Sequence, residues 1–300
     1  MISRLVLLAA LAGGPWAACQ ASALRFCDQP ATLNAEQKDE LFRFGAIVKG
    51  ALENSGQGVA LIARSGLDLS RFDVRYSHAG LSLQSGLDTP WAVRQLYYAC
   101  DEQRPRIYDQ GMTGFLLGLN DPAIGYVSVV FLPADAGAAL ARVAGDKRQV
   151  LQALAPVYSA NAYPFSLRYQ NCNQWVAEML ATAWGDPVDG EDLRAQAQHW
   201  LQAQGYEPTV FDVGYRPHLW IAAGFVPWLH QDDHPREDLD RMRLRVSTPA
   251  SIEAFVQATV PGAQRMEFCH AGRRVVIRHG WDLIPEGCQP GEHDQVVMLD

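Results

Sequence analysis

Residues 169–176 read YQNCNQWV and place a cysteine at the head of a helix. Asn171 is a good N-cap residue, and the apolar residues after Cys172 recur at helical spacing as far as Trp184. A helix start favours an anion, because its first backbone N–H groups have no partner within the helix and the macrodipole is positive there. Cys172 therefore stands where a thiolate nucleophile is favoured and where backbone N–H groups could hold an oxyanion.

A second stretch, SHAGL at residues 77–81, supplies a histidine. Its surroundings are typical of a strand, and Gly80 leaves space beside His78. An imidazole near the thiol would take the thiol proton and return it to the leaving group, so we expect Cys172 as nucleophile and His78 as base. The alternative is structural, because a cysteine at a helix start is often a small core residue and a strand histidine is often a hydrogen-bonded polar group.

The two stretches resemble the signatures of the circularly permuted papain-like superfamily, which includes NlpC-type cell-wall cysteine peptidases and relatives of lecithin:retinol acyltransferase. In the permuted members the histidine strand precedes the cysteine helix, as in residues 59–184 here. The resemblance implies a third polar residue on the neighbouring strand that orients the histidine, and Gln95 is our candidate. Histidine or an acidic residue is commoner at that place, and a neutral amide stabilises an imidazolium less than a carboxylate does.

Three residues near the cysteine are candidates for substrate binding or for the oxyanion site, namely Asn171, Asn173 and Tyr169. The whole chain after residue 23 also resembles a bacterial family of secreted proteins catalogued as domain of unknown function 2145. Residues 228–235 and 278–281 are further marks of that family, which by itself implies no activity.

The first residues have the pattern of a secretory signal, which we expect at 1–23. Residues 1–23 carry one basic residue, Arg4, then an apolar run and the cleavage pattern Ala-Ser-Ala at 21–23. The apolar run is too short to span a bilayer, and no later segment is apolar enough to cross one. We therefore expect a periplasmic or secreted protein, with lipid attachment at Cys19 as a minor alternative.

Beyond the signal the cysteines are odd in number, namely Cys27, Cys100, Cys172, Cys269 and Cys288. An oxidising compartment favours disulfides, and an odd number leaves at least one thiol over. If that thiol is Cys172, the other four cysteines allow three pairings. We favour Cys269 with Cys288 and Cys27 with Cys100, while another cysteine as the odd one is the open alternative.

Composition and charge narrow the class of protein. Hydrophobic residues make up 48% of the chain and charged residues 19%, which suffices for a buried core. The net charge of −8 argues against nucleic acid or an anionic membrane as the partner.

His230 and His234, with Asp232 and Asp233 between them, invite a metal hypothesis. Prolines flank the segment and argue against the regular helix that such spacing would need. We expect a structured loop with local hydrogen bonds, and neither a metal nor a cofactor.

The pattern of hydrophobic residues predicts an α+β fold, with an antiparallel sheet packed by helices. We divide the chain into the signal at 1–23, a permuted papain-like domain at 24–236 and a small C-terminal β-α-β-β appendage at 237–300. Helices are expected at 34–53, 112–119, 133–143, 146–156, 171–184, 191–204 and 249–259. Strands are expected at 59–63, 73–83, 91–98, 127–132, 241–246, 265–269 and 273–279.

The sequence leads to two functional hypotheses. The first is a secreted cysteine hydrolase with an amidase or peptidase activity on cell-wall peptides, and a lipid ester or acyl transfer is the second choice of chemistry. The alternative is a catalytically weak or inactive papain-like module that binds a peptide or another partner in the cell envelope.

Overall fold

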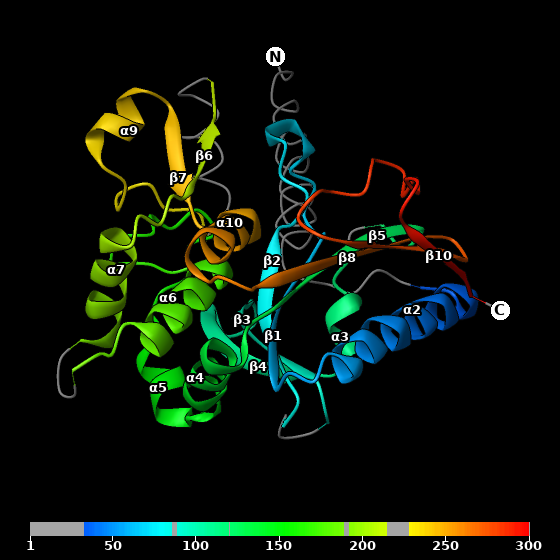
Figure 1. The fold of residues 1–300 in the computed structure, drawn as a ribbon. Coiled ribbons are helices and arrows are strands. Elements are labelled where there is room, and N and C mark those ends of the chain that lie inside the picture. The colour runs from blue at the N-terminus through cyan, green and yellow to red at the C-terminus, as the bar shows by residue number, and fades with distance from the viewer. Residues whose placement is uncertain (1–32, 86–88, 120, 189–191, 215–227, 300) are drawn as a thin grey trace, which may run out of the picture.

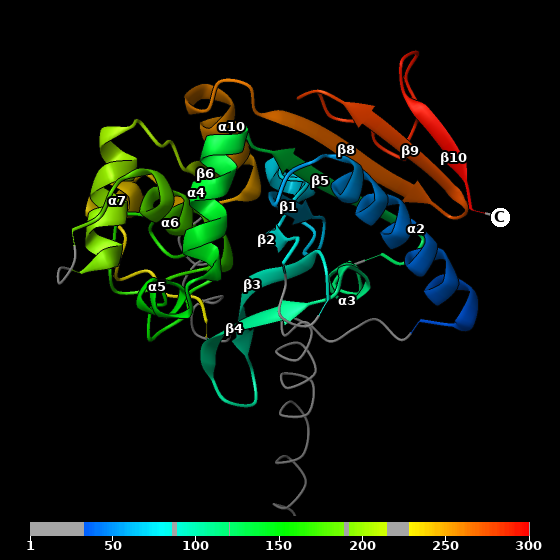
Figure 2. The ribbon, with the colours of Figure 1, turned by 60° about the horizontal axis from the view of Figure 1, so that its bottom comes forward.

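One antiparallel sheet runs through the molecule, and helices cover both of its faces (Figures 1 and 2). The structure is a computed structural model that describes residues 33–85, 89–119, 121–188, 192–214 and 228–299. The expected signal and the cysteines at 19 and 27 lie outside these residues. The predicted α+β class, with an antiparallel sheet packed by helices, is confirmed.

Within the described residues the large sheet has 8 strands in the order β10-β9-β8-β5-β1-β2-β3-β4, and a second sheet pairs β6 with β7. The strands are β1 (Val59–Arg64), β2 (His78–Leu83), β3 (Ala92–Ala99), β4 (Arg104–Gln110), β5 (Ile124–Phe131), β6 (Thr209–Asp212), β7 (Arg243–Val246), β8 (Gln264–Ala271), β9 (Arg274–His279) and β10 (Gln295–Met298). Three of them, β4, β6 and β10, were not among the expected strands, and β2 begins at His78 instead of residue 73.

β1 divides the interior into two hydrophobic cores. All six of its residues are buried, because successive side chains point to opposite faces of a sheet that is covered on both sides. Val59 and Leu61 join the first core, whereas Ala60 and Ile62 join the second.

The helices are shared unequally between the two faces (Figure 2). The first core is covered by α4 (Ala134–Gly145), α5 (Lys147–Gln152), α6 (Cys172–Trp184), α7 (Leu193–Ala203) and α10 (Pro249–Thr259). The second core is covered by α2 (Ala35–Asn54) and α3 (Met112–Leu116), and the short α9 (Arg236–Asp240) follows β6 in the chain. The predicted capping box of α2, between Asn34 and Gln37, is present.

α6 is the central helix of the first layer. Its residues from Cys172 to Thr182 are all buried, because the sheet lies on one side of it and α4, α7 and α10 pack around the rest. A helix enclosed in this way must be apolar on every side or must pair its polar side chains.

The C-terminal strands extend the same sheet. β8 pairs with β5 along its whole length, from Gln264 opposite Phe131 to Ala271 opposite Ile124. The expected boundary at residue 236 therefore does not coincide with a break in the sheet. A buried charge also joins the two parts, because Glu267 of β8 accepts a hydrogen bond from Arg75 at 2.9 Å, just before β2.

The disulfides follow part of the predicted pattern. Cys269 is bonded to Cys288, as expected, and Cys172 carries a thiol. Cys100 is also disulfide-bonded, and Cys27, the partner we expected for it, lies outside the described residues.

The Cys269–Cys288 disulfide closes a loop of 19 residues, and removing it should destabilise the C-terminal strands. A variant with both cysteines changed to alanine should unfold with a free energy lower by about 3 kcal/mol, because the unfolded chain regains the entropy of the open loop. Chemical denaturation of the two proteins without reductant checks this value. An unchanged midpoint would contradict a stabilising role for this bond.

His270 of β8 gives the fold a pH dependence. Its side chain is fully buried against Phe44 of α2, with the ring centroids 4.8 Å apart, and burial lowers the pKa of the imidazole to about 4. The main chain of Gly272 and the charge of Asp121 offset part of that shift. Because the folded pKa lies below the unfolded value, protons bind the unfolded chain more readily.

The free energy of unfolding should therefore be highest above pH 6.5 and should fall by about 3 kcal/mol as the pH drops to 4. His270→Leu should remove this part of the slope. His279→Leu, which changes an exposed histidine of the adjacent strand β9, should retain it. Urea unfolding at a series of pH values measures both slopes, and identical slopes for the two variants would refute the assignment to His270.

Candidate active site

Cys172 is the first residue of α6, as the sequence predicts. Asn171 is its N-cap, and the Asn171 side-chain oxygen accepts a hydrogen bond of 2.7 Å from the backbone N–H of Gln174. The cysteine is only 6% exposed. Among the first N–H groups of the helix, those of Cys172 and Asn173 have no carbonyl partner within the helix. The positive end of the helix dipole favours an anion at this position, whereas the surrounding apolar core opposes one.

His78 is the first residue of β2, and its ring is held by Gln95 of β3. The His78 Nε2 atom lies 2.7 Å from the Gln95 side-chain oxygen. The Gln95 amide nitrogen in turn donates to the side-chain oxygen of Gln110 at 2.6 Å. Since the Gln95 oxygen can only accept, Nε2 carries the proton of the neutral ring, and Nδ1 is the basic nitrogen.

Gly80 makes this contact possible. A Cβ atom at residue 80 would lie 2.6 Å from Val93 Cγ1 and 3.3 Å from Gln95 Cβ. The absence of a side chain therefore leaves room for the Gln95 side chain to cross β2 towards His78. The space that the sequence suggests beside the histidine is filled by its hydrogen-bond partner.

The His78 ring lies on the α3 side of the sheet. Its centroid is 4.8 Å from that of Tyr97 and 6.0 Å from that of Phe115 in α3. Arg64, opposite His78 on β1, donates to the Tyr97 hydroxyl at 2.9 Å and stacks over Phe115. By contrast Ala79 belongs to the same core cluster as Cys172. Any meeting of thiol and imidazole therefore takes place around the end of β2, not across one face of the sheet.

A hydrogen bond joins the two motifs at that end. Asn173, the residue after the cysteine, donates from its side-chain amide to the backbone oxygen of Ser77, the residue before the histidine, at 3.1 Å. The same amide donates to the backbone oxygen of Ser247 at 3.2 Å. The structure thus brings the start of α6 to the start of β2, although the two residues are 96 positions apart.

The side-chain amides of both asparagines that flank Cys172 donate hydrogen bonds to backbone oxygens. Asn171 donates to the backbone oxygens of Ala160 at 3.2 Å and Ser247 at 3.3 Å. Neither side chain therefore presents its amide N–H groups to a substrate in this structure. Donors to an oxyanion would come from the main chain of Cys172 and Asn173.

Tyr169 packs against the segment of residues 228–234. Its hydroxyl donates to Asp232 at 2.9 Å, and its ring stacks on that of His230 at 4.2 Å with an angle of 12°. Burial, followed by the charge and hydrogen bond of Asp232, raises the pKa of Tyr169. Its hydroxyl remains neutral and acts as an anchor for the loop that leads to the cysteine.

Asp233 and His234 form hydrogen bonds with a segment distant in the sequence, at residues 161–163, instead of the local bonds that we expected. Asp233 accepts the backbone N–H of Tyr163 at 2.8 Å, and burial raises the pKa of this carboxyl. His234 Nε2 lies 2.7 Å from the backbone oxygen of Asn161. In the part of the chain that the structure describes, no group of three His, Cys, Asp or Glu side chains is placed to hold a metal ion.

A buried ion pair behind the cysteine was not predicted. Glu178 of α6 is fully buried and is bound by Arg194 of α7, with Arg194 Nε 2.8 Å from a carboxylate oxygen. The other Arg194 nitrogens donate to the backbone oxygens of Leu167 and Tyr169, at 2.9 and 3.1 Å. Gln170, Gln174 and Gln198 also donate to Glu178. The signal available in the sequence was a row of polar residues at four-residue spacing, Gln174, Glu178 and Thr182, in a helix that is otherwise mostly apolar.

Three aromatic side chains, those of Tyr98, Tyr158 and Trp228, lie next to the loop that leads to Cys172. The Tyr98 ring centroid is 5.3 Å from those of both Tyr158 and Trp228. Tyr158 forms a β-bridge with Gln170, two residues before the cysteine. Tyr98 and Tyr158 are partly exposed, so they offer an apolar surface beside the site. Sequence reasoning missed this group because its members come from three distant segments.

One protein family matches the chain, and its description reads uncharacterized protein conserved in bacteria, DUF2145. The match covers residues 51–256. The chain belongs to this family. This confirms the resemblance to domain of unknown function 2145, and the matched residues include His78, Gln95 and Cys172. No curated protein and no solved structure matches the chain. The papain-like resemblance stays a prediction.

Arg194 should stabilise the folded protein by pairing with the buried Glu178 behind Cys172. Arg194→Met would leave Glu178 as a buried carboxylate without its charged partner, at a cost of about 3–5 kcal/mol in the free energy of unfolding. Arg168→Met is the matched control, because Arg168 pairs with Asp232 at the surface, where both side chains are more than half exposed. The control should cost less than about 1 kcal/mol.

Thermal and urea unfolding of both variants test this difference. Equal losses of stability in the two variants would show that Arg194 has no special structural role.

Proposed function

We propose that this protein is a periplasmic or secreted thiol hydrolase that cleaves amide bonds of cell-wall peptides. The observation that carries the proposal is the hydrogen bond between His78 Nε2 and Gln95. It orients the imidazole with Nδ1 as its base, which is what a cysteine nucleophile requires of its histidine. The start of α6 adds the electrostatic environment that favours a thiolate.

The reaction would proceed in two stages. His78 Nδ1 takes the Cys172 thiol proton, and the sulfur attacks the carbonyl carbon of the substrate. The main-chain N–H groups at the start of α6 stabilise the oxyanion, and the C–N bond breaks as the imidazolium protonates the leaving amine. Water, deprotonated by His78, then hydrolyses the thioester and releases the acid and the thiol.

The partner of the histidine limits the rate. A neutral amide at Gln95 orients the ring but stabilises the imidazolium less than a carboxylate would. We therefore propose a slow or substrate-restricted hydrolase. Transfer of an acyl group or hydrolysis of a lipid ester is the second choice of chemistry for the same residues.

The proposed location rests on the expected signal at residues 1–23 and on the disulfides. Cys269 is paired with Cys288, and Cys100 is also disulfide-bonded, which suits an oxidising compartment. Among the described residues, none of the helices has the length and apolar character needed to cross a bilayer.

A second candidate function is a binding module without catalysis. Two observations favour it: the His78 ring packs with Phe115 on the side of the sheet opposite the core that contains Cys172, and the amide N–H groups of Asn171 and Asn173 are bonded to the main chain. In this hypothesis the partly exposed Tyr98 and Tyr158 contact a peptide or envelope partner.

Alkylation of the thiol distinguishes the two functions. If Cys172 is activated, iodoacetamide should label it rapidly at pH 6, where an ordinary thiol is almost wholly protonated. His78→Ala should lower that rate at least tenfold, and Gln95→Ala should lower it less. Gln95→Glu should raise it, because a carboxylate stabilises the imidazolium of the ion pair.

The labelled residue is mapped by mass spectrometry on the non-reduced protein, with His279→Ala as an exposed control that should leave the rate unchanged. A Cys172 that resists alkylation up to pH 9, or that reacts equally in His78→Ala, would reject the hydrolase and leave the binding module. Cell-wall peptide fragments are the first substrates to screen once labelling is selective.

A further inference from the structure

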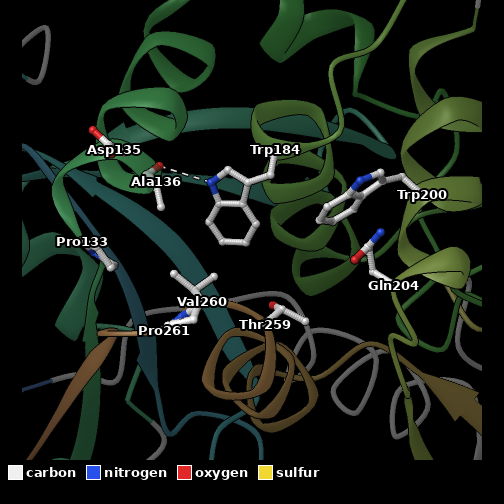
Figure 3. A pocket seen from close by; sticks show the side chains of 9 residues that line it. All are labelled: Pro133, Asp135, Ala136, Trp184, Trp200, Gln204, Thr259, Val260 and Pro261. Atoms are coloured by element: carbon white, nitrogen blue, oxygen red, sulfur yellow. Dashed lines mark hydrogen bonds between the residues drawn. The ribbon is translucent and has the colours of Figure 1, made fainter.

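A pocket lies at the far end of α6, away from Cys172 (Figure 3). Trp184 ends this helix, so the pocket and the thiol are separated by its length of about 20 Å. The pocket has a volume of about 330 Å³, within the range of sites for small ligands. Its lining is formed by Pro133, Asp135, Ala136, Trp184, Trp200, Gln204, Thr259, Val260 and Pro261.

Two half-buried indoles form the walls of the pocket, and both are held in place. Trp184 donates from its indole nitrogen to the backbone oxygen of Ala136 at 3.2 Å. Trp200 packs against Gly185, where a Cβ atom would lie 2.9 Å from its ring. Phe255 supports Trp200 edge-on, with ring centroids 6.0 Å apart. Figure 3 shows both indoles pointing into the same space from different helices.

The lining of the pocket carries one charged side chain, and it is acidic. Its lining contains the carboxylate of Asp135 and no lysine, arginine or histidine. Asp135 is exposed at the rim, so its side chain is able to turn towards a bound group.

Three helices end at the pocket. Trp184 is the last residue of α6, Gln204 is the C-cap of α7, and Val260 is the C-cap of α10. None of these helices has a basic residue in its last turn, so the negative ends of three macrodipoles meet with no cationic side chain among the described residues that line the pocket. α4 begins here with its positive end, which opposes a bound cation, and it carries the carboxylate of Asp135 in its first turn.

We propose that this pocket binds an organic cation, an ammonium group that carries alkyl substituents. The indole faces attract a cation through their quadrupoles and bury its apolar substituents, while the helix ends and Asp135 favour its charge. A quaternary ammonium matches these conditions most closely, because it needs no hydrogen-bond acceptor. The inference does not depend on the activity proposed for Cys172.

Neutral ligands are the competing occupants. A sugar ring could also stack on an indole and bond to Gln204, and a branched alkane could fill the apolar volume. Neither carries a positive charge that the three helix C-termini and Asp135 would favour. Charge, at constant shape, is therefore the property to test.

Choline and 3,3-dimethylbutan-1-ol provide that comparison, since they share one shape and differ in charge. Calorimetric titration of the mature protein should show choline binding at least tenfold more tightly than the neutral alcohol. The indole N–H signal of Trp184 should shift in the NMR spectrum with the same midpoint. Added salt should weaken the binding of choline.

Variants assign the effect to the pocket. Trp200→Leu should reduce the affinity for choline at least tenfold, and Asp135→Asn should reduce it severalfold without loss of the fold, because this side chain is exposed. Asp39→Asn on α2 removes the same charge from a distant exposed site and should change nothing.

Equal affinity for the two probes, binding of glucose in preference to choline, or no binding of choline up to 50 mM would overturn the proposal. So would an affinity that Asp135→Asn and Asp39→Asn change to the same extent. Because the Cys172 alkylation experiment uses a different site and a different signal, either proposal can fail while the other stands.

Discussion

The burial of α6 is the constraint on which the rest of the molecule depends. The helix is enclosed by the sheet, α4, α7 and α10, yet it carries Glu178 at its centre. A carboxylate in that position must be paired, and Arg194 pairs it while also holding the backbone of Leu167 and Tyr169. One ion pair therefore fixes α7 on α6 and sets the path of the loop that delivers Cys172.

A second buried charge has the same effect on the histidine side. Glu267 of β8 accepts hydrogen bonds from Tyr76 and Arg75, the residues that lead into β2. The start of β2 is thus positioned by the C-terminal strands, while the start of α6 is positioned by α7. The hydrogen bond from Asn173 to Ser77 joins the two assemblies where the candidate residues are found.

The sequence predicts most of the elements that have a strong local signal. The N-cap at Asn171, the helix that follows and the capping box at Asn34 all depend on side chains within one turn, and all are present. β4, β6 and β10 were missed because their stability comes from pairing with strands elsewhere, and their residues do not alternate clearly.

For the site, the sequence identifies the residue types but not their directions. Gln95 contacts His78 as predicted from the resemblance, whereas the placement of the ring beside Phe115 follows from the register of β2, which no short motif encodes. The Glu178–Arg194 pair and the two indoles of the pocket at the end of α6 join segments that are distant in sequence. Such contacts become visible only when the fold is known.

The pairing of β5 with β8 has a consequence for how the chain folds. Arg75 and Glu267 are 192 residues apart, and Tyr126 contacts Cys288 across 162 residues. Loop closure over such distances costs entropy before the contacts are gained, so this topology folds slowly. A chain that emerges with its N-terminus first from a ribosome or a translocation channel has β1 to β5 long before it has β8. Until its last strands arrive, the sheet ends at β5, whose outer backbone groups are an unpaired edge open to other chains.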